Sequence, residues 1–266
     1  MDHDPRDAET GSPPIFNVPA TMLALIALLV AVQALRATAT AQMDLTLIHD
    51  LAFVPARLTA WLSPETVVER LIELRDGEEE DVRAAMIGQF YLSGGVKPWT
   101  LVTYAALHGG WAHLAVNAAW LLAFGSAVNR RFGSARFMAL AIATAAGGAL
   151  VHLAVHPADF SPMVGASAVA AGAMGAATRF IFQPGAPLGG SLSPLAGEAA
   201  YRAPAPPWRE ALRDRRAALF LGSWFVMNLV FGLFAHPLGL SDSPVAWEAH
   251  IGGLLAGFFL FDLLDP

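Results

Sequence analysis

Six apolar stretches limit this chain to one broad class of fold. They occupy approximately residues 19 to 41, 111 to 128, 135 to 155, 165 to 182, 217 to 235 and 246 to 264. Roughly 20 apolar residues in a helix cross the hydrocarbon core of a bilayer. The chain is 55% hydrophobic and only 14% charged, which is far from the balance of a soluble domain. The sequence therefore predicts an all-α membrane protein with six transmembrane helices, surrounded by lipid.

The remaining composition excludes several kinds of chemistry. The chain has no cysteine, so disulfides, thiol chemistry and cysteine-based metal sites are excluded. Its net charge of −6 indicates no nucleic-acid partner. The acidic N-terminal segment lacks the basic region of a cleavable signal peptide, and the first apolar stretch is longer than the core of one. We therefore expect the first helix to remain as an anchor.

The polar segments define the domain organisation. Residues 1–18 are predicted to be a disordered cytoplasmic tail, because they combine prolines with scattered charges. Residues 19–264 form one transmembrane domain, which includes a long outer loop at 44–98. Residues 184–209 are rich in Pro, Gly and Ser and are predicted to be a flexible cytoplasmic linker.

Two parts of the long loop carry a readable pattern. Apolar residues at positions 45, 48, 51, 58 and 62 roughly follow helical spacing, which predicts a helix lying in the membrane interface. The acidic run Glu78-Glu79-Glu80-Asp81 is interpreted as a solvated face.

Basic residues in the short connections predict the orientation. Arg130, Arg131 and Arg136 follow the second stretch, and five arginines lie between positions 202 and 216. The connections 156 to 162 and 236 to 245 carry no Lys or Arg. By the positive-inside rule, both termini are cytoplasmic, and helices two, four and six run from outside to inside. A composition rich in Ala and Arg with almost no Lys indicates GC-rich DNA, hence the inner membrane of a bacterium.

Polar side chains enter the membrane at the starts of three helices. They are His113 and Asn117 in the second helix, Ser167 in the fourth and His250 in the sixth. Such residues are costly inside a bilayer and by default mark function. Because these three helices share a direction, positions near their starts lie at a similar depth. The four side chains are therefore expected to meet in one plane.

The spacing of small residues favours a close approach between the fourth and sixth helices. His250, Gly253 and Gly257 share one helical face, so a glycine groove runs beneath the histidine. Small residues below Ser167 allow the two backbones to approach. Ser167 and His250 then form a nucleophile with its general base, the minimum for serine acyl transfer. Alternatively, Ser167 is only a helix cap, and the glycines pair two copies of the chain.

A second pair of residues fits the oxyanion that such a reaction creates. His113 and Asn117 are four residues apart and therefore share a face of the second helix. Together with the backbone N–H of Ser167 they offer donors for a tetrahedral intermediate. The positive end of the fourth helix's dipole favours the same charge.

Three motifs together resemble the rhomboid family of intramembrane serine proteases. They are the segment from His108 to Asn117, the segment Gly165-Ala166-Ser167, and the segment from Ala249 to Gly253 followed by Gly257. The resemblance implies a six-helix bundle whose dyad lies in a water-filled cavity and cuts transmembrane segments of other proteins. It also implies that Ser167 is the nucleophile, His250 the base, and His113 and Asn117 the oxyanion side chains.

Two positions depart from the family pattern. The residue after the serine is usually glycine and here is Ala168, which raises the question of how the Ser167 amide is aimed. Many members place a tyrosine four residues after the serine, stacked on the histidine, and here that residue is Ala171. The orientation of His250 must therefore come from elsewhere, and Glu248 is expected to lie on another face.

Other readings of the histidines and aromatic residues remain open. An inactive rhomboid-like protein that binds transmembrane clients is one alternative, and a metal or haem carrier using His108, His113, His152 and His250 is another. His152 and His156 have ligand spacing, but the sequence offers no third ligand nearby except Asp159, so no metal and no cofactor is expected. His108 is interpreted as structural, bonded to the first loop.

The substrate is expected to enter laterally past the fifth helix. Bulky side chains on that helix are candidates for a gate, namely Trp224, Phe225, Phe231 and Phe234. The sequence leaves the oligomeric state, the physiological substrate and the cleavage sequence open.

Overall fold

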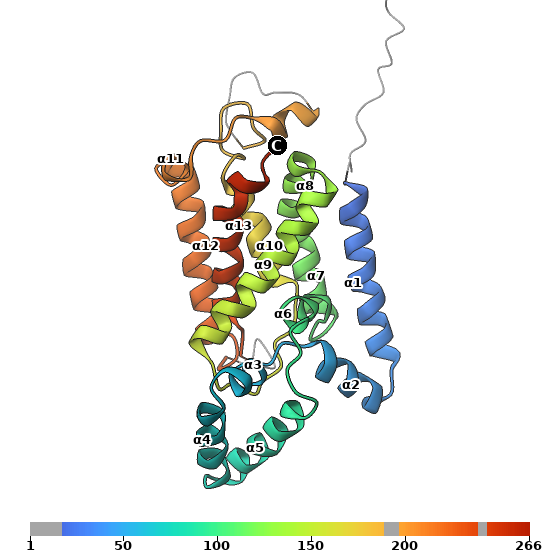
Figure 1. Ribbon diagram of the computed structural model, residues 1–266. Helices are drawn as coiled ribbons and strands as arrows, with labels where there is room; N and C mark the ends of the chain where they lie inside the picture. Colours follow the sequence, from blue (N-terminus) through green and yellow to red (C-terminus); the bar gives the residue numbers. More distant parts are fainter. Residues whose placement is uncertain (1–17, 189–196, 239–243) are drawn as a thin grey trace, which may run out of the picture.

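The structure, a computed structural model, describes residues 18–188, 197–238 and 244–266 and is a helical bundle without a β-strand in those ranges (Figure 1). Within these ranges, five helices are long and apolar enough to cross a membrane. They are α1 (Ala20–Thr38), the continuous helix Trp111–Phe132, α9 (Ser134–Val155), α12 (Arg215–Phe234) and α13 (Trp247–Leu264). The helix Trp111–Phe132 consists of α7 (Trp111–Trp120), a π-helical turn (Leu121–Gly125) and α8 (Ser126–Phe132). The prediction of an all-α membrane protein is confirmed.

The fourth predicted crossing is shorter than the others. It forms α10 (Ser167–Thr178), only 12 residues, or about 18 Å of helix. The remainder of the expected stretch, 179 to 182, continues as turns. All residues of α10 after Ser167 are buried, and α10 lies in the middle of the bundle in Figure 1. Because protein rather than lipid covers it, its ends need not reach the membrane surfaces.

The 44–98 region forms four helices at the end of the bundle opposite the C-terminus (Figure 1). They are α2 (Ala41–Leu51), α3 (Pro55–Leu62), α4 (Pro64–Arg75) and α5 (Glu79–Leu92). The predicted interfacial helix over 45 to 62 is therefore two helices. Pro55 explains the break, since proline starts a helix well but cannot continue one. The acidic run is exposed, as predicted, and opens α5, where the Asp81 carboxylate accepts the Glu78 N–H at 3.2 Å.

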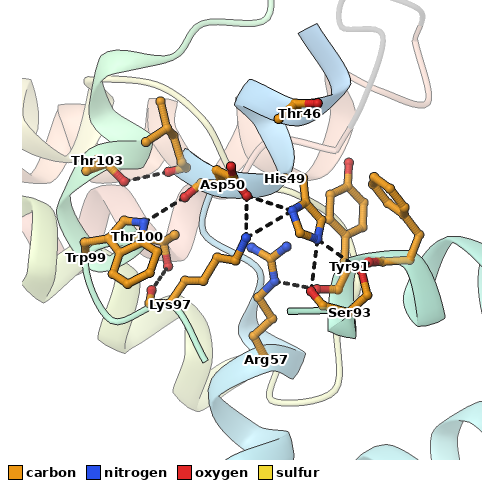
Figure 2. Close-up of polar contacts among 12 residues, drawn as sticks. Thr46, His49, Asp50, Arg57, Tyr91, Ser93, Lys97, Trp99, Thr100 and Thr103 are labelled. Carbon is orange, nitrogen blue, oxygen red and sulfur yellow. Dashed lines mark hydrogen bonds and ion pairs between the residues drawn. The ribbon is translucent and has the colours of Figure 1, made fainter. Parts of the chain in front are cut away.

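A polar network fixes this region to the bundle (Figure 2). Lys97 Nζ donates a hydrogen bond to Asp50 and lies 3.0 Å from the His49 ring, and Trp99 Nε1 donates to the Asp50 carbonyl at 2.8 Å. The hydrogen bond from Lys97 lowers the pKa of Asp50. These contacts join the end of α2 to the segment that leads into α6 (Thr100–Thr103).

Two buried arginines form ion pairs at the C-terminal end of α13. Arg131 of α8 pairs with Asp265 at 2.5 Å, and Arg179, directly after α10, pairs with Asp262 at 2.6 Å. Nearby, the described part of the predicted linker contains a 3₁₀ turn (Gly197–Arg202) and the short helix α11 (Trp208–Ala211). The predicted tail, apart from residue 18, and the middle of the linker, 189–196, lie outside the described residues.

Candidate active site

The α10 and α13 helices meet backbone to backbone. A Cβ added to Gly253 would overlap the Ala168 carbonyl oxygen, and one added to Gly257 would overlap that of Gly172. The two contacts are four residues apart on both helices, so α10 and α13 run parallel in a fixed register. The predicted glycine groove is confirmed, and within one chain. We call these two contacts the glycine seam.

Ala168 of α10 fits between α9 and α13, although glycine is usual at this position in the family that the chain resembles. A Cβ added to Gly148 of α9 would lie 2.6 Å from the Ala168 methyl group and 2.8 Å from the Ala249 carbonyl oxygen. The missing side chain at position 148 therefore leaves the space that the extra methyl group occupies. Ala168 itself lies inside α10, and no described residue other than glycine has a positive φ. The extra methyl group therefore requires no strained backbone at this position.

His113 and Asn117 face the loop that leads into α10. Gly165 has φ +124°, a conformation that side chains rarely adopt, and its N–H donates to the Tyr104 carbonyl at 3.1 Å. A Cβ at this position would lie 2.7 Å from His113 Cε1, 2.9 Å from His113 Nε2 and 3.7 Å from Asn117 Nδ2. Only glycine lets the loop approach both side chains, two residues before Ser167.

The hydrogen bonds of this pair leave donors available. The Gly109 N–H donates to His113 Nδ1 at 3.3 Å, so in the neutral ring the proton resides on Nε2, the atom beside Gly165. Asn117 Nδ2 donates one hydrogen bond to the His113 carbonyl at 3.0 Å, which leaves its second N–H. Both side chains can therefore donate at the start of α10.

His250 is held by a residue from another helix. Its Nδ1 lies 2.6 Å from Oδ1 of Asn228, which is a buried residue of α12. Asn228 Nδ2 donates to the Trp247 carbonyl at 3.2 Å, which fixes the amide with its oxygen toward the ring. The His250 Nδ1–H then donates to that oxygen, so Nε2 keeps its lone pair. This contact supplies the orientation that Ala171 cannot give.

Ser167 is the first residue of α10 and is partly exposed. Its backbone N–H is one of the first-turn amides that have no acceptor within the helix. His250 lies one turn before Gly253, so the seam brings the two helices together just at this level. The described residues contain no hydrogen bond between Ser167 and His250. Such bonds are often long before substrate binds.

His108 supports the loop before Ser167. Its Nε2 accepts the Ala166 N–H at 3.4 Å, and its carbonyl accepts from Arg36 of α1 at 2.5 Å. It therefore bonds α1 and the serine loop, not the 44–98 region as expected. Burial lowers the pKa of His108 to about 4, and the nearby His113 and Arg36 act in the same direction.

Two features of the site were not predicted from the sequence. They are the contact of Asn228 with His250 and the position of Glu248 beside His152. Asn228 is the one amide side chain in the apolar stretch 217 to 235, and a polar group in a span is itself a signal. Glu248 does lie away from His250, as expected, but it faces His152 and His156 of α9. That contact joins residues about a hundred positions apart, and no local spacing reveals it.

Comparison with known proteins identifies the family of the chain. Residues 96–264 match the model of the Rhomboid domain. The chain is 28% identical over 162 residues to "Rhomboid protease GluP" of Bacillus subtilis (strain 168), an alignment that covers 60% of this chain and 25% of that protein. It is 30% identical over 162 residues to "RHOMBOID-like protein 5" of Arabidopsis thaliana, covering 61% of this chain and 42% of the relative. The alignments thus span less than half the length of either relative.

Proposed function

This chain belongs to the rhomboid family, and we propose on that premise that it is a serine endopeptidase that cleaves transmembrane segments of other membrane proteins. The observation that carries the proposal is the glycine seam. It places the helix that starts at Ser167 beside the helix that carries His250, while His113 and Asn117 face the loop before the serine. This arrangement supports roles for Ser167 as nucleophile, His250 as base, and His113 and Asn117 as oxyanion donors.

In the proposed reaction, Ser167 Oγ attacks the scissile carbonyl carbon and His250 Nε2 accepts the hydroxyl proton. Asn228 keeps the Nδ1–H tautomer and stabilises the imidazolium that forms, the role that a third group has in other serine and cysteine proteases. The oxyanion accepts hydrogen bonds from His113 Nε2, Asn117 Nδ2 and the Ser167 N–H. His250 then protonates the leaving amine, and water hydrolyses the acyl-enzyme by the same route.

The substrate helix enters past α12. This helix buries only Ala217 and Asn228 among its 20 residues, and Phe225, Phe231 and Phe234 are each about half exposed (46%, 54% and 52%). The α12 helix has fewer buried residues than any of the other four long helices, so its movement would break the fewest packing contacts. A helical substrate hides its carbonyls in hydrogen bonds, so segments with small or helix-breaking residues are the expected substrates.

The arginine distribution gives the proposed orientation. Both termini lie in the cytoplasm, the helices α2 to α5 lie outside, and the reaction takes its water from the outer side. The proposed location is the inner membrane of a bacterium.

The test is cleavage of a model transmembrane substrate by the purified chain in detergent or liposomes. Ser167→Ala and His250→Ala should each reduce kcat by at least about 10³-fold, as expected for a nucleophile and its base. Ser223→Ala is the matched control, because its hydroxyl bonds only the Phe220 carbonyl of its own helix. Equal cleavage by Ser167→Ala would exclude the proposal.

Labelling by a fluorophosphonate separates the proposed enzyme from an inactive, client-binding relative. The wild type should become labelled at Ser167 and the Ser167→Ala variant should not. A wild type that neither cuts nor reacts would contradict the proposed enzyme and favour the client-binding alternative.

A further inference from the structure

A group of three ligand side chains lies where α9 ends and α13 begins. His152 belongs to the last turn of α9, His156 directly follows that helix, and Glu248 lies in the first turn of α13. One ligand atom from each residue lies within 4.8 Å of the others. His156 Nε2 is 2.9 Å from Glu248 Oε1, and His152 Nδ1 is 3.7 Å from Glu248 Oε2.

The group contains a buried nitrogen that has no hydrogen bond. The side chains of His152 and Glu248 are each only 8% exposed. His152 Nδ1 is buried and has no hydrogen-bond partner among the described residues, although it lies on the side of the carboxylate. An unsatisfied buried polar atom is costly. The contact of His156 with Glu248 leaves this nitrogen unused, whereas a cation between the three side chains would use all three.

We propose that His152, His156 and Glu248 bind one divalent first-row transition metal ion, with Zn²⁺ as the ion whose chemistry fits best. Two imidazoles and one carboxylate form a ligand set typical of zinc, with a fourth position for water. Two ligands about 2.1 Å from one ion are at most about 4 Å apart. Both distances to Glu248 are already below that value. Because all three ligand atoms lie within 4.8 Å of one another, small side-chain rotations would bring the two imidazole nitrogens within it as well.

The surroundings give a cation access to this group. His156 is 43% exposed. It borders a groove between the 156–162 loop and α4 and α5, whose lining includes three carboxylates and one arginine. These are Glu80, Asp81, Asp159 and Arg70. The acidic run at the start of α5 would attract cations to this groove, because negative side chains around a groove concentrate cations.

Bound metal would join α9 to α13 at the turn that leads into His250. Glu248 and His250 are two residues apart on α13 and therefore point to nearly opposite sides of the helix. The metal would not contact the base. The proposal does not depend on proteolysis, and each can fail without the other.

The experiment uses the purified full chain, stripped with a chelator and titrated with ZnCl₂. Bound zinc is measured by mass spectrometry after desalting, and thermal unfolding is followed in parallel. We expect about one zinc per chain and a rise in Tm of about 5 °C or more at saturation. Co²⁺ in place of Zn²⁺ should give the visible absorption of a four-coordinate site.

Variants assign the binding to these residues. His156→Ala and Glu248→Gln should each weaken zinc binding by more than tenfold, because removing an outer partner alone already costs roughly 10–100-fold. His236→Ala removes an exposed histidine elsewhere and should bind as the wild type does. His250→Ala should also retain the zinc, which separates this site from the dyad.

His156→Ala keeps the test decisive if Glu248→Gln fails to fold, because His156 is half-exposed. Undiminished zinc binding by His156→Ala, or the absence of stoichiometric zinc in the wild type, would overturn the proposal.

Discussion

The two helices that serve the candidate site from opposite sides differ in how they are held. The α10 helix buries every residue after Ser167, and its carbonyl oxygens touch glycines of α13. The α12 helix buries only Ala217 and Asn228. The proposed nucleophile is thus positioned by backbone contact, whereas the proposed base is oriented by one polar bond from a helix that is mostly exposed on the outside of the bundle. The first arrangement resists any added atom, and the second depends on one side chain.

Adding a single methyl group tests this difference most directly. Gly257→Ala should destabilise the protein by at least about 3 kcal/mol, because its Cβ overlaps the Gly172 carbonyl oxygen and backbone cannot give way cheaply. Gly222→Ala on α12 is the matched change, since a Cβ there meets nothing within 4 Å. It should be neutral or stabilising by up to about 1 kcal/mol. Thermal unfolding in detergent measures both, and similar Tm values would remove the contrast.

Removing the orienting amide tests the other side of the comparison. Asn228→Ala should lower kcat by about 10- to 100-fold, part of the 10²–10⁴-fold that a general base contributes, with little change in Tm. Asn228→Asp keeps the acceptor for His250 Nδ1 and should recover most of the loss.

Met227→Ala is the control for Asn228, because Met227 is the next residue of α12 and is 55% exposed. A loss of activity that Asp does not restore, or one that Met227→Ala reproduces, would show that Asn228 acts through packing.

Acid should loosen the loop before α10 through His108. The folded state lowers the pKa of His108 to about 4, so between the unfolded value near 6.5 and pH 4 the unfolded chain binds more protons. The contribution of neutral His108 to the stability of the fold is therefore present above about pH 6.5 and is lost as the pH decreases toward 4. The loss is about 1 kcal/mol at pH 5.5.

Tm between pH 7.5 and 5, compared with His108→Gln, measures this effect. The variant should have a flatter profile over that range. Parallel profiles for the two proteins would contradict the assignment.

The smallest effect is expected in the part-buried polar network between α2 and the segment that leads into α6. Lys97→Met removes one of two partners of the Asp50 carboxylate, the one whose hydrogen bond lowers the pKa of Asp50 most. The pair stabilises the fold above the unfolded pKa of the carboxyl group, near 4, and the contribution is lost as the pH falls through the lower folded value. At neutral pH we expect a loss of less than about 1 kcal/mol, because the Asp50 side chain is 49% exposed and retains its contact with His49. A chemical denaturation curve at pH 7 checks it, and a larger loss would show that the 44–98 region is held more tightly than its exposure indicates.

The features that could be predicted from the sequence are those that depend on the spacing of residues within one helix. The apolar stretches, the glycines three and seven residues after His250, and the pair His113 and Asn117 all lie within single helices, so a periodic pattern identifies them. Family resemblance then assigned roles to them. The length of α10 was not predictable in this way, because Arg179 lies inside an apolar stretch and only its burial against α13 shows where the helix stops.

The contacts missed from the sequence depend on how helices rotate about their axes. Asn228 meets His250 only because α12 turns its one amide inward, and Glu248 meets His152 only because α9 and α13 lie side by side. Hydropathy is nearly uniform around these helices, so it carries little information about rotation. Each polar residue in a span indicated that a polar contact exists, but did not identify the residue with which it forms that contact.

The glycine seam also sets what can move. With carbonyl oxygens against glycine α-carbons, no layer of side chains remains between α10 and α13 that could repack as they slide. A shift by one turn would displace His250 by about 5.4 Å relative to Ser167, and a smaller shift would drive backbone into backbone. The two helices therefore behave as one rigid body. If a substrate helix enters as proposed, the opening must form around this body, and the spacing of Ser167 and His250 is already fixed at that point.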